Sequence, residues 1–372
     1  MSAAQWRRAM NSSAQAVANP TGARVVTAPS ATSSSAPQIV REPWRNPIGA
    51  RHVIVLLALL IYPFFATPFF IFQIAGQALL LGTIALSLTF LAGSGGMVSL
   101  AQMTVAGVAG YLVAIFGTSA SPISLGWPWW VSVLLAIAIA TAFATFVGWL
   151  AVRTEGIYTI MITLAIGVAF YYLVLQNYSI FNGFQGFHKV TPPVIWGIDF
   201  GQAVPYYFLA LFWALASYFF IKYLLRAPFG IALQGVRDNP RRMNALGFHV
   251  TAHRVAAYAI AGLIAAIGGV LLLWYNKLIT PGVIGTGALI NILVIAVLGG
   301  MRHPIGPFIG AIVFVLLQTF AIDSIFRERF NLVIGTIFLI IVLFSSDGLL
   351  GWWARLRSGT GGGQARLREP TR

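Results

Sequence analysis

Long apolar runs, each about 20 residues and nearly free of charge, follow one another along most of this sequence. Charged residues make up only 8% of the chain, whereas a soluble globular domain carries about a quarter. In lipid every backbone N–H and C=O must be bonded within the protein, so a run of this length folds as a helix. Strands of a membrane barrel would instead show short segments of alternating polarity. The sequence therefore predicts an all-α integral membrane protein.

We expect about ten transmembrane helices. Eight or nine are the alternatives, because the first two runs are barely separated and the eighth is short. Their approximate bounds are 53–71, 73–93, 97–117, 129–151, 157–176, 205–225, 255–275, 288–300, 305–321 and 331–347.

The basic residues predict the orientation of these helices. With ten spans, all but four of the 23 lysine and arginine residues fall on one side, the exceptions being Lys189, Lys277, Arg327 and Arg329. Because basic residues stay in the cytoplasm, we predict cytoplasmic termini: a disordered basic tail at 1–51, a polytopic domain at 52–350 and a basic tail at 351–372. Trp127, Trp129 and Trp130 are typical of an interfacial belt on the outer face.

One cytoplasmic loop, at about 226–254, carries the signals of folded structure. Asn239 is suited to cap a short helix, Pro240 to its first turn and Gly247 to the position after its end. Residues 229–236 before it favour another helical turn, and Thr251 is suited to cap the next span. The alternative is a plain basic connector against lipid headgroups; the capping pattern favours an element that docks onto a soluble partner.

Four stretches resemble a known family. They read LSLTFLAGSGGMVSLAQMTVAGVAGYLVA (86–114), RTEGIYTIMITLAIG (153–167), FGIALQGVRDNPRRMNALGFHVTAHRVAAYAIAGLIAAIGG (229–269) and VLGGMRHPIGPFIGA (297–311). In this order and spacing they resemble the permeases of ATP-binding-cassette importers for branched-chain amino acids, of the LivH/LivM type.

This resemblance implies a multi-pass protein of the bacterial inner membrane, surrounded by membrane lipid. It implies three protein partners: cytoplasmic ATPase subunits that bind ATP, a second related permease and a periplasmic solute-binding protein. It also implies that the loop docks onto the ATPase through Gly230, Arg237, Asp238, Asn239, Ala245, Leu246 and Gly247. The chain itself has no GxxxxGK[ST] phosphate loop, so we expect no cofactor in it.

Two glycine clusters interrupt the helical pattern and predict where a solute crosses, because irregular backbone is tolerated in a membrane only where it is buried or lines a cavity. The alternative is that small residues simply let helices pack closely. The predicted path residues are Gly93, Gly95, Gly96, Ser99, Gln102, Thr104, Thr159, Thr163, Asn291, Gly299 and Gly300.

The residues that other classes of function require are not found in the sequence. We find no nucleophile–base–acid set and so predict no catalytic residue and no enzyme. We also predict no metal site, because His249 and His253, although spaced four residues apart, have no acid or cysteine beside them. The net charge of +15 follows from topology, so no nucleic-acid partner is expected.

Three transport hypotheses remain. The first is an importer permease for branched-chain amino acids or a related solute. The second is a permease of the same class for urea or short amides. The third is an ATP-independent channel for a small neutral solute, which would leave the structured basic loop unexplained.

Overall fold

The structure is a computed structural model that describes residues 50–119, 121–195, 197–301 and 303–322, with residues 336, 348 and 349. Nearly all of the predicted tail 1–51, the whole tail 351–372 and, apart from residue 336, the predicted span 331–347 lie outside the described residues. Contacts divide the chain into two units, Met1–Leu57 and Ala58–Arg372. Only the first half of one helix is described from the first unit, and all the other described elements belong to the second.

The described chain is mostly helical, with one small hairpin of two antiparallel strands. The longer helices are α2 (Ala50–Phe65), η1 (Phe70–Gly76, a π-helix), α3 (Gln77–Gly95), α4 (Gln102–Phe116), α5 (Trp129–Ala151), α6 (Ile157–Gln176), α8 (Ala203–Leu224), α9 (Pro228–Asp238), α11 (Val250–Asn276), α12 (Thr286–Gly299) and α13 (Gly306–Ile322). The short elements are α7 (Tyr178–Phe181), η2 (Gly183–Gln185), β1 (Val194–Ile195), β2 (Ile198–Asp199), α10 (Pro240–Ala245) and η3 (Pro281–Ile284).

Within the described residues, five helices are long and apolar enough to cross a membrane: Phe70–Gly95, Trp129–Ala151, Ile157–Gln176, Ala203–Leu224 and Val250–Asn276. Three further apolar helices, α4, α12 and the start of α13, are shorter. Together with the helical runs expected from the sequence, these helices make the protein an all-α membrane protein, whatever its final count of spans.

Two predicted boundaries are wrong. The break expected at residue 72 is absent, because η1 runs directly into α3; the chain breaks instead just before Pro68, which disfavours helix in the preceding residue. The span expected at 97–117 begins only at Gln102, because Gly96 takes a left-handed conformation and ends α3.

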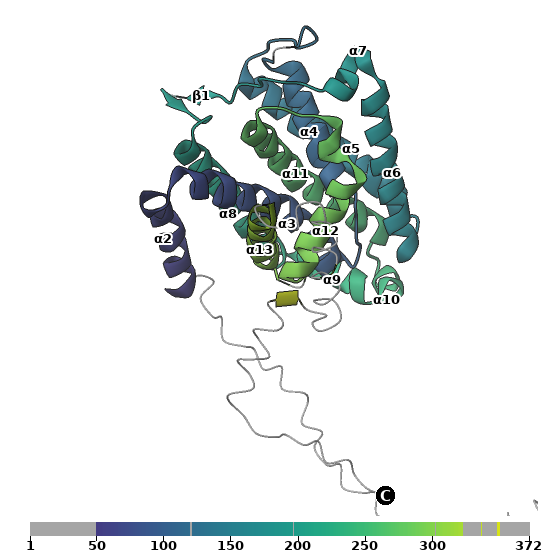
Figure 1. The fold of residues 1–372 in the computed structure, drawn as a ribbon. Coiled ribbons are helices and arrows are strands. Elements are labelled where there is room, and N and C mark those ends of the chain that lie inside the picture. The colour runs from purple at the N-terminus through teal and green to yellow at the C-terminus, as the bar shows by residue number, and fades with distance from the viewer. Residues whose placement is uncertain are drawn as a thin grey trace, which may run out of the picture. The chain divides into compact units, whose positions relative to one another are not determined.

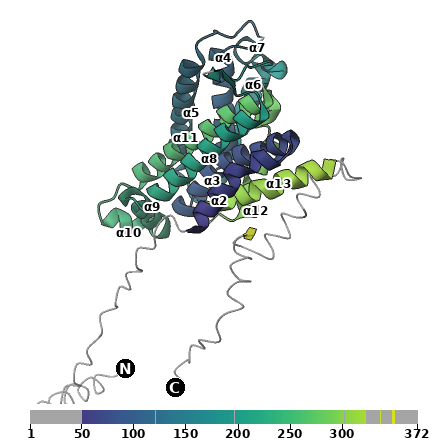
Figure 2. The same ribbon diagram turned by 90° about the vertical axis from the view of Figure 1, so that its left-hand side faces the viewer.

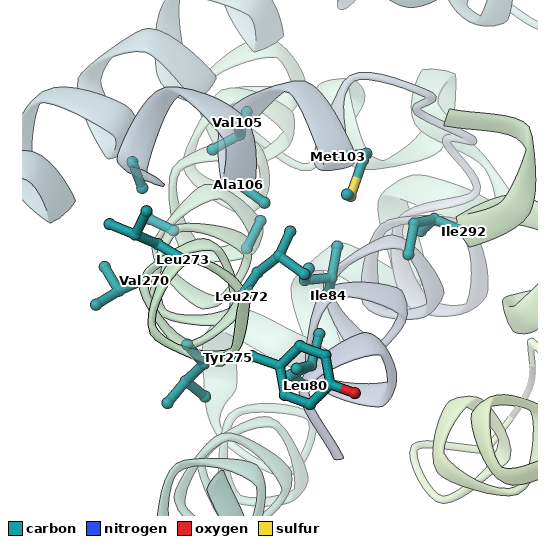
Figure 3. Packing of buried hydrophobic residues seen from close by; sticks show 14 of the residues in the cluster. Leu80, Ile84, Met103, Val105, Ala106, Val270, Leu272, Leu273, Tyr275 and Ile292 are labelled. Atoms are coloured by element: carbon teal, nitrogen blue, oxygen red, sulfur yellow. The ribbon is translucent and has the colours of Figure 1, made fainter. Parts of the chain in front are cut away.

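The centre of the second unit is formed by α3 and α11. Their membrane segments are 78% and 67% buried, against 22% for α6. Figure 3 shows how side chains of α3, α4, α11 and α12 interdigitate there. Because lipid is as apolar as these side chains, close packing rather than exclusion from water holds such helices together.

A close approach of backbones joins α12 to α13. A Cβ atom on Gly299 would lie 1.8 Å from the carbonyl oxygen of Gly306, and one on Gly310 would lie 2.1 Å from that of Ile295. No other residue type fits at these positions without moving a helix.

The polar elements gather at opposite ends of the helices. Figures 1 and 2 both place α9 and α10 at one end, and α7 with the neighbouring loop at the other. We call the first the α9 end and the second the α7 end.

Candidate functional site

The pair α9–α10 is a built element, as the sequence predicted. Pro228 occupies the first turn of α9, and Leu233 and Val236 are buried on its inner face. Leu233 packs with Met97, just beyond the end of α3. Gly230 is needed for the turn from α8, since a Cβ there would lie 2.2 Å from the carbonyl oxygen of Leu224.

The helix α10 has the predicted caps. The Asn239 side chain accepts a hydrogen bond from the Arg242 N–H at 2.9 Å, and Pro240 is the first helical residue. Gly247 follows the end with φ +89° and open space around it. The prediction that Thr251 caps the next span is wrong, because α11 begins at Val250 and Thr251 lies inside it.

The outer surface of this pair is basic and apolar at once. Arg241, Arg242 and Ala245 are exposed. Leu246 and Ile231 expose 66% and 63% of their surface. A surface of this composition suits a protein partner better than water, since exposed large apolar side chains beside arginine are typical of interface centres.

Arg237 connects α9 to the end of α3. Its Nε donates to Asp238 Oδ1 at 3.0 Å, and its guanidinium also donates to the carbonyl oxygen of Gly93. That carbonyl belongs to the last turn of α3, whose oxygens lack partners within the helix and attract a cation. Gly96 follows with φ +67°, and a Cβ there would lie 2.6 Å from Arg237 Cγ. The arginine therefore both bonds to the end of α3 and packs on it.

A cavity of about 160 Å³ lies beside this connection. It is lined by the last half of α3, the end of α8, α9 and the segment after α12. The two glycine clusters therefore meet here: Gly93 lines the cavity, and Gly299 and Gly300 directly precede Met301, which also lines it.

Three polar residues that line the cavity were not anticipated from the sequence: Thr89, Ser94 and Gln234. The hydroxyl of Thr89 is buried without a hydrogen-bond partner among the described residues. Gln234 lies one helical turn before Arg237, and this spacing was the available signal.

Five of the predicted polar path residues are buried outside this cavity, and we call them the polar cluster: Ser99, Gln102, Thr104, Thr159 and Thr163. Where α3 gives way to α4, the Leu100 N–H donates to Thr163 Oγ1 at 3.1 Å. The Ser87 hydroxyl lies 3.1 Å from Gln102 Oε1. Thr159 donates to the Thr154 carbonyl oxygen at 2.9 Å.

This cluster is closed in the single chain. Ser99 and Thr104 are fully buried; the Thr104 hydroxyl has no hydrogen-bond partner among the described residues, and the Ser99 hydroxyl lies beside that of Tyr258. Asn291 is half-buried on α12, and the structure does not place it in the cavity. The cavity and the cluster are therefore two polar regions that have no residue in common.

A half-buried cation lies close to the same region. Arg254, expected in the loop, lies in the first turn of α11 with only 14% of its side chain exposed, and it pairs with Glu155 at 3.7 Å. The pair joins α11 to the turn before α6.

Comparison with known proteins identifies the family to which this chain is similar. A family model described as the branched-chain amino acid transport system permease component matches residues 70–343. The permease protein LivM of the high-affinity branched-chain amino acid transport system of Salmonella typhimurium is 25% identical over 248 residues, covering 60% of this chain and 58% of that protein. The match thus spans less than two thirds of the length of that relative.

Two further relatives widen the comparison. A probable branched-chain amino acid transport permease protein LivM of Methanocaldococcus jannaschii is 25% identical over 58% of this chain and 68% of its own length. The nucleoside ABC transporter permease protein NupC of Lactococcus lactis is 29% identical over 35% of this chain and 40% of its own. No solved structure gives a significant match.

The family match begins at the first residue of η1 and takes in both glycine clusters, the α9–α10 pair and the cavity between them. The chain therefore belongs to the family of permease components of branched-chain amino acid transport systems.

Proposed function

We propose that this chain is the permease subunit of an ATP-binding-cassette importer in the bacterial inner membrane, and that a separate ATPase drives it through α9–α10. The observation that carries the proposal is the contact of Arg237 with the Gly93 carbonyl at the end of α3. A partner that pushes on α9 moves the last turn of α3, and with it one wall of the cavity.

Both termini and the α9 end lie in the cytoplasm in this proposal, which the distribution of basic residues supports. ATP binds to the partner subunit, because the sequence contains no phosphate loop. A second, related permease completes the path, and a periplasmic binding protein delivers the solute at the α7 end.

The proposed solutes are leucine, isoleucine and valine, which the names of most of the relatives support. Urea or short amides are the next candidates, since a relative named for nucleosides shows that such permeases are not limited to one solute class. A binding protein that co-purifies with this chain is expected to bind leucine and not urea; the reverse would replace the first solute class by the second.

Two substitutions test the coupling between the ATPase and the cavity, one expected to prevent binding of the ATPase and the other to reduce uptake. Leu246→Asp places a charge on the exposed apolar surface and is expected to abolish co-purification with the ATPase. Arg237→Ala leaves that surface intact, so the ATPase still binds, but uptake falls by roughly 5- to 150-fold, the range of a typical coupling free energy. Arg226→Ala, an exposed arginine that precedes α9 and lies outside both that surface and the cavity, is the control for Arg237→Ala.

Two results would overturn the proposal. One is normal uptake by stably inserted Leu246→Asp and Arg237→Ala proteins. The other is solute flux through the purified chain alone in liposomes without ATP, which would establish the channel instead.

A further inference from the structure

A second cavity, of about 280 Å³, opens on the surface of the chain between α5 and α8. Its floor is α11, which packs against both of these helices, and Val270, Leu271 and Trp274 on that floor are almost fully buried. Trp129 of α5 and Trp213 of α8 stand on the walls. All of the residues that line this groove are apolar, so a charged or strongly polar solute gains nothing by entering it.

The groove and Lys277 beyond its end together span about the thickness of one lipid leaflet. Its floor begins at Ile267 and continues through Trp274, and Lys277 follows as the residue that ends α11. Ten residues of helix rise about 15 Å, which is half of the roughly 30 Å hydrocarbon core of a bilayer. An extended acyl chain in this groove reaches from the middle of the membrane to the surface at the α7 end.

Two charges stand at the surface end of the groove. Lys277 Nζ donates to the carbonyl oxygen of Gly201 at 3.1 Å, and the Gly201 N–H donates to Asp199 Oδ1 at 2.7 Å. Phe200, which lies between Asp199 and Gly201 in the sequence, lines the groove. A cation and a carboxylate are thus held side by side where the groove meets the headgroup region.

The backbone of Lys277 has an unfavourable conformation. Its φ is +54°, in the left-handed region, which costs an L-residue about 1–2 kcal/mol and costs glycine nothing. A helix end of this geometry is usually occupied by glycine. A lysine here is therefore unusual for a helix end, and its exposed side chain lies beside Gly201 and Asp199.

We propose that this groove is a binding site for a phospholipid with an amine headgroup, such as phosphatidylethanolamine, from the leaflet at the α7 end. One acyl chain fills the groove, the phosphate lies against Lys277 and the headgroup ammonium against Asp199. The site is independent of the ATPase coupling proposed above.

The test is native mass spectrometry of the full-length chain, with phosphatidylethanolamine and phosphatidylglycerol added separately. The wild-type protein is expected to retain one phosphatidylethanolamine in preference to phosphatidylglycerol. Lys277→Gln removes the charge at unchanged backbone strain and is expected to weaken that binding about five-fold. Lys189→Gln is the matched control, because Lys189 is exposed, has the same φ of +54° and lies outside the groove.

A second pair of variants tests the groove itself. Val133→Trp fills it and is expected to abolish retention of the lipid. Leu134→Trp, at the next position of α5 and 65% exposed outside the groove, is expected to leave retention unchanged.

Equal retention by wild-type, Lys277→Gln and Val133→Trp proteins would overturn the proposal. So would a preference for phosphatidylglycerol, which the carboxylate of Asp199 disfavours. A crosslink from Phe212, exposed on the wall of the groove, to a second protein chain would show that protein and not lipid occupies it.

Discussion

One pair of residues, Gly96 and Arg237, links the two halves of the proposed mechanism. The glycine supplies the left-handed turn that ends α3, and its missing side chain leaves room for the arginine. The arginine then reaches the Gly93 carbonyl. Each residue depends on the other for this role. The two lie far apart in the sequence, and only the folded structure brings them into contact.

Gly96→Ala is therefore expected to lower stability and uptake by more than its backbone strain explains. The strain costs about 1–2 kcal/mol, and the new Cβ also displaces Arg237 from the end of α3. Gly126→Ala is the matched control, with φ +66° but nothing within 4 Å. Thermal unfolding and solute uptake are measured for both; equal losses would show that the Arg237 contact has no added value.

At the scale of elements, α10 is short enough that its caps decide whether it forms. Six residues bury little surface, and an isolated helix of that length is unstable in water. The Asn239 side chain and the turn at Gly247 supply partners and geometry at its two ends.

Asn239→Ala is expected to destabilise α10 by about 1 kcal/mol, whereas Asn239→Asp keeps the capping oxygen and should behave like the wild type. Hydrogen exchange of the amides at 241–246, followed by mass spectrometry, measures this directly. Unchanged exchange in the alanine variant would mean that packing on α9 holds α10 without its cap.

The contact between α12 and α13 predicts a second element-scale effect. Gly299→Ala forces a methyl group onto the Gly306 backbone, and we expect a protein that is poorly folded or strongly destabilised. Gly287→Ala, in the first turn of the same helix with nothing within 4 Å, should be neutral or slightly stabilising, since alanine favours helix over glycine. Comparable melting temperatures of the two variants would contradict the close packing.

Helix caps could be predicted from the sequence, but the sides of the helices that face the interior of the protein could not. The caps of α10 follow from residues within one turn of each other, so Asn239, Pro240 and Gly247 could be assigned. Thr89 and Ser94 could not, because α3 is apolar on every side and its pattern does not reveal which face meets α8 and α9. In water the polar face of a helix points outward; in lipid that signal is lost.

For the whole molecule, the two ends of the bundle make orientation measurable. The chain has no cysteine, so a single introduced thiol is the only one to react. Leu246→Cys at the α9 end and Phe184→Cys at the α7 end are exposed by 66% and 73% at the native side chains. We expect a membrane-impermeant maleimide added to intact cells to label only Phe184→Cys. Labelling of Leu246→Cys alone would invert the proposed topology.

The central position of α3 has a consequence for biosynthesis. Its final neighbours α11 and α13 begin at Val250 and Gly306, so they leave the ribosome long after α3 does. Meanwhile the hydroxyl groups of Thr83, Ser87 and Ser94 bond to carbonyl oxygens three or four residues back in the same helix. Hydroxyls satisfied in this way do not need a neighbouring helix.

The helix that ends up most enclosed is thus equipped to enter the bilayer by itself. An insertion assay with a glycosylation reporter on residues 70–95 alone is expected to show efficient integration, and failure would mean that it enters with a later segment. Newly made α3 can therefore remain among lipid tails, with these three hydroxyls already bonded, until the later helices pack around it.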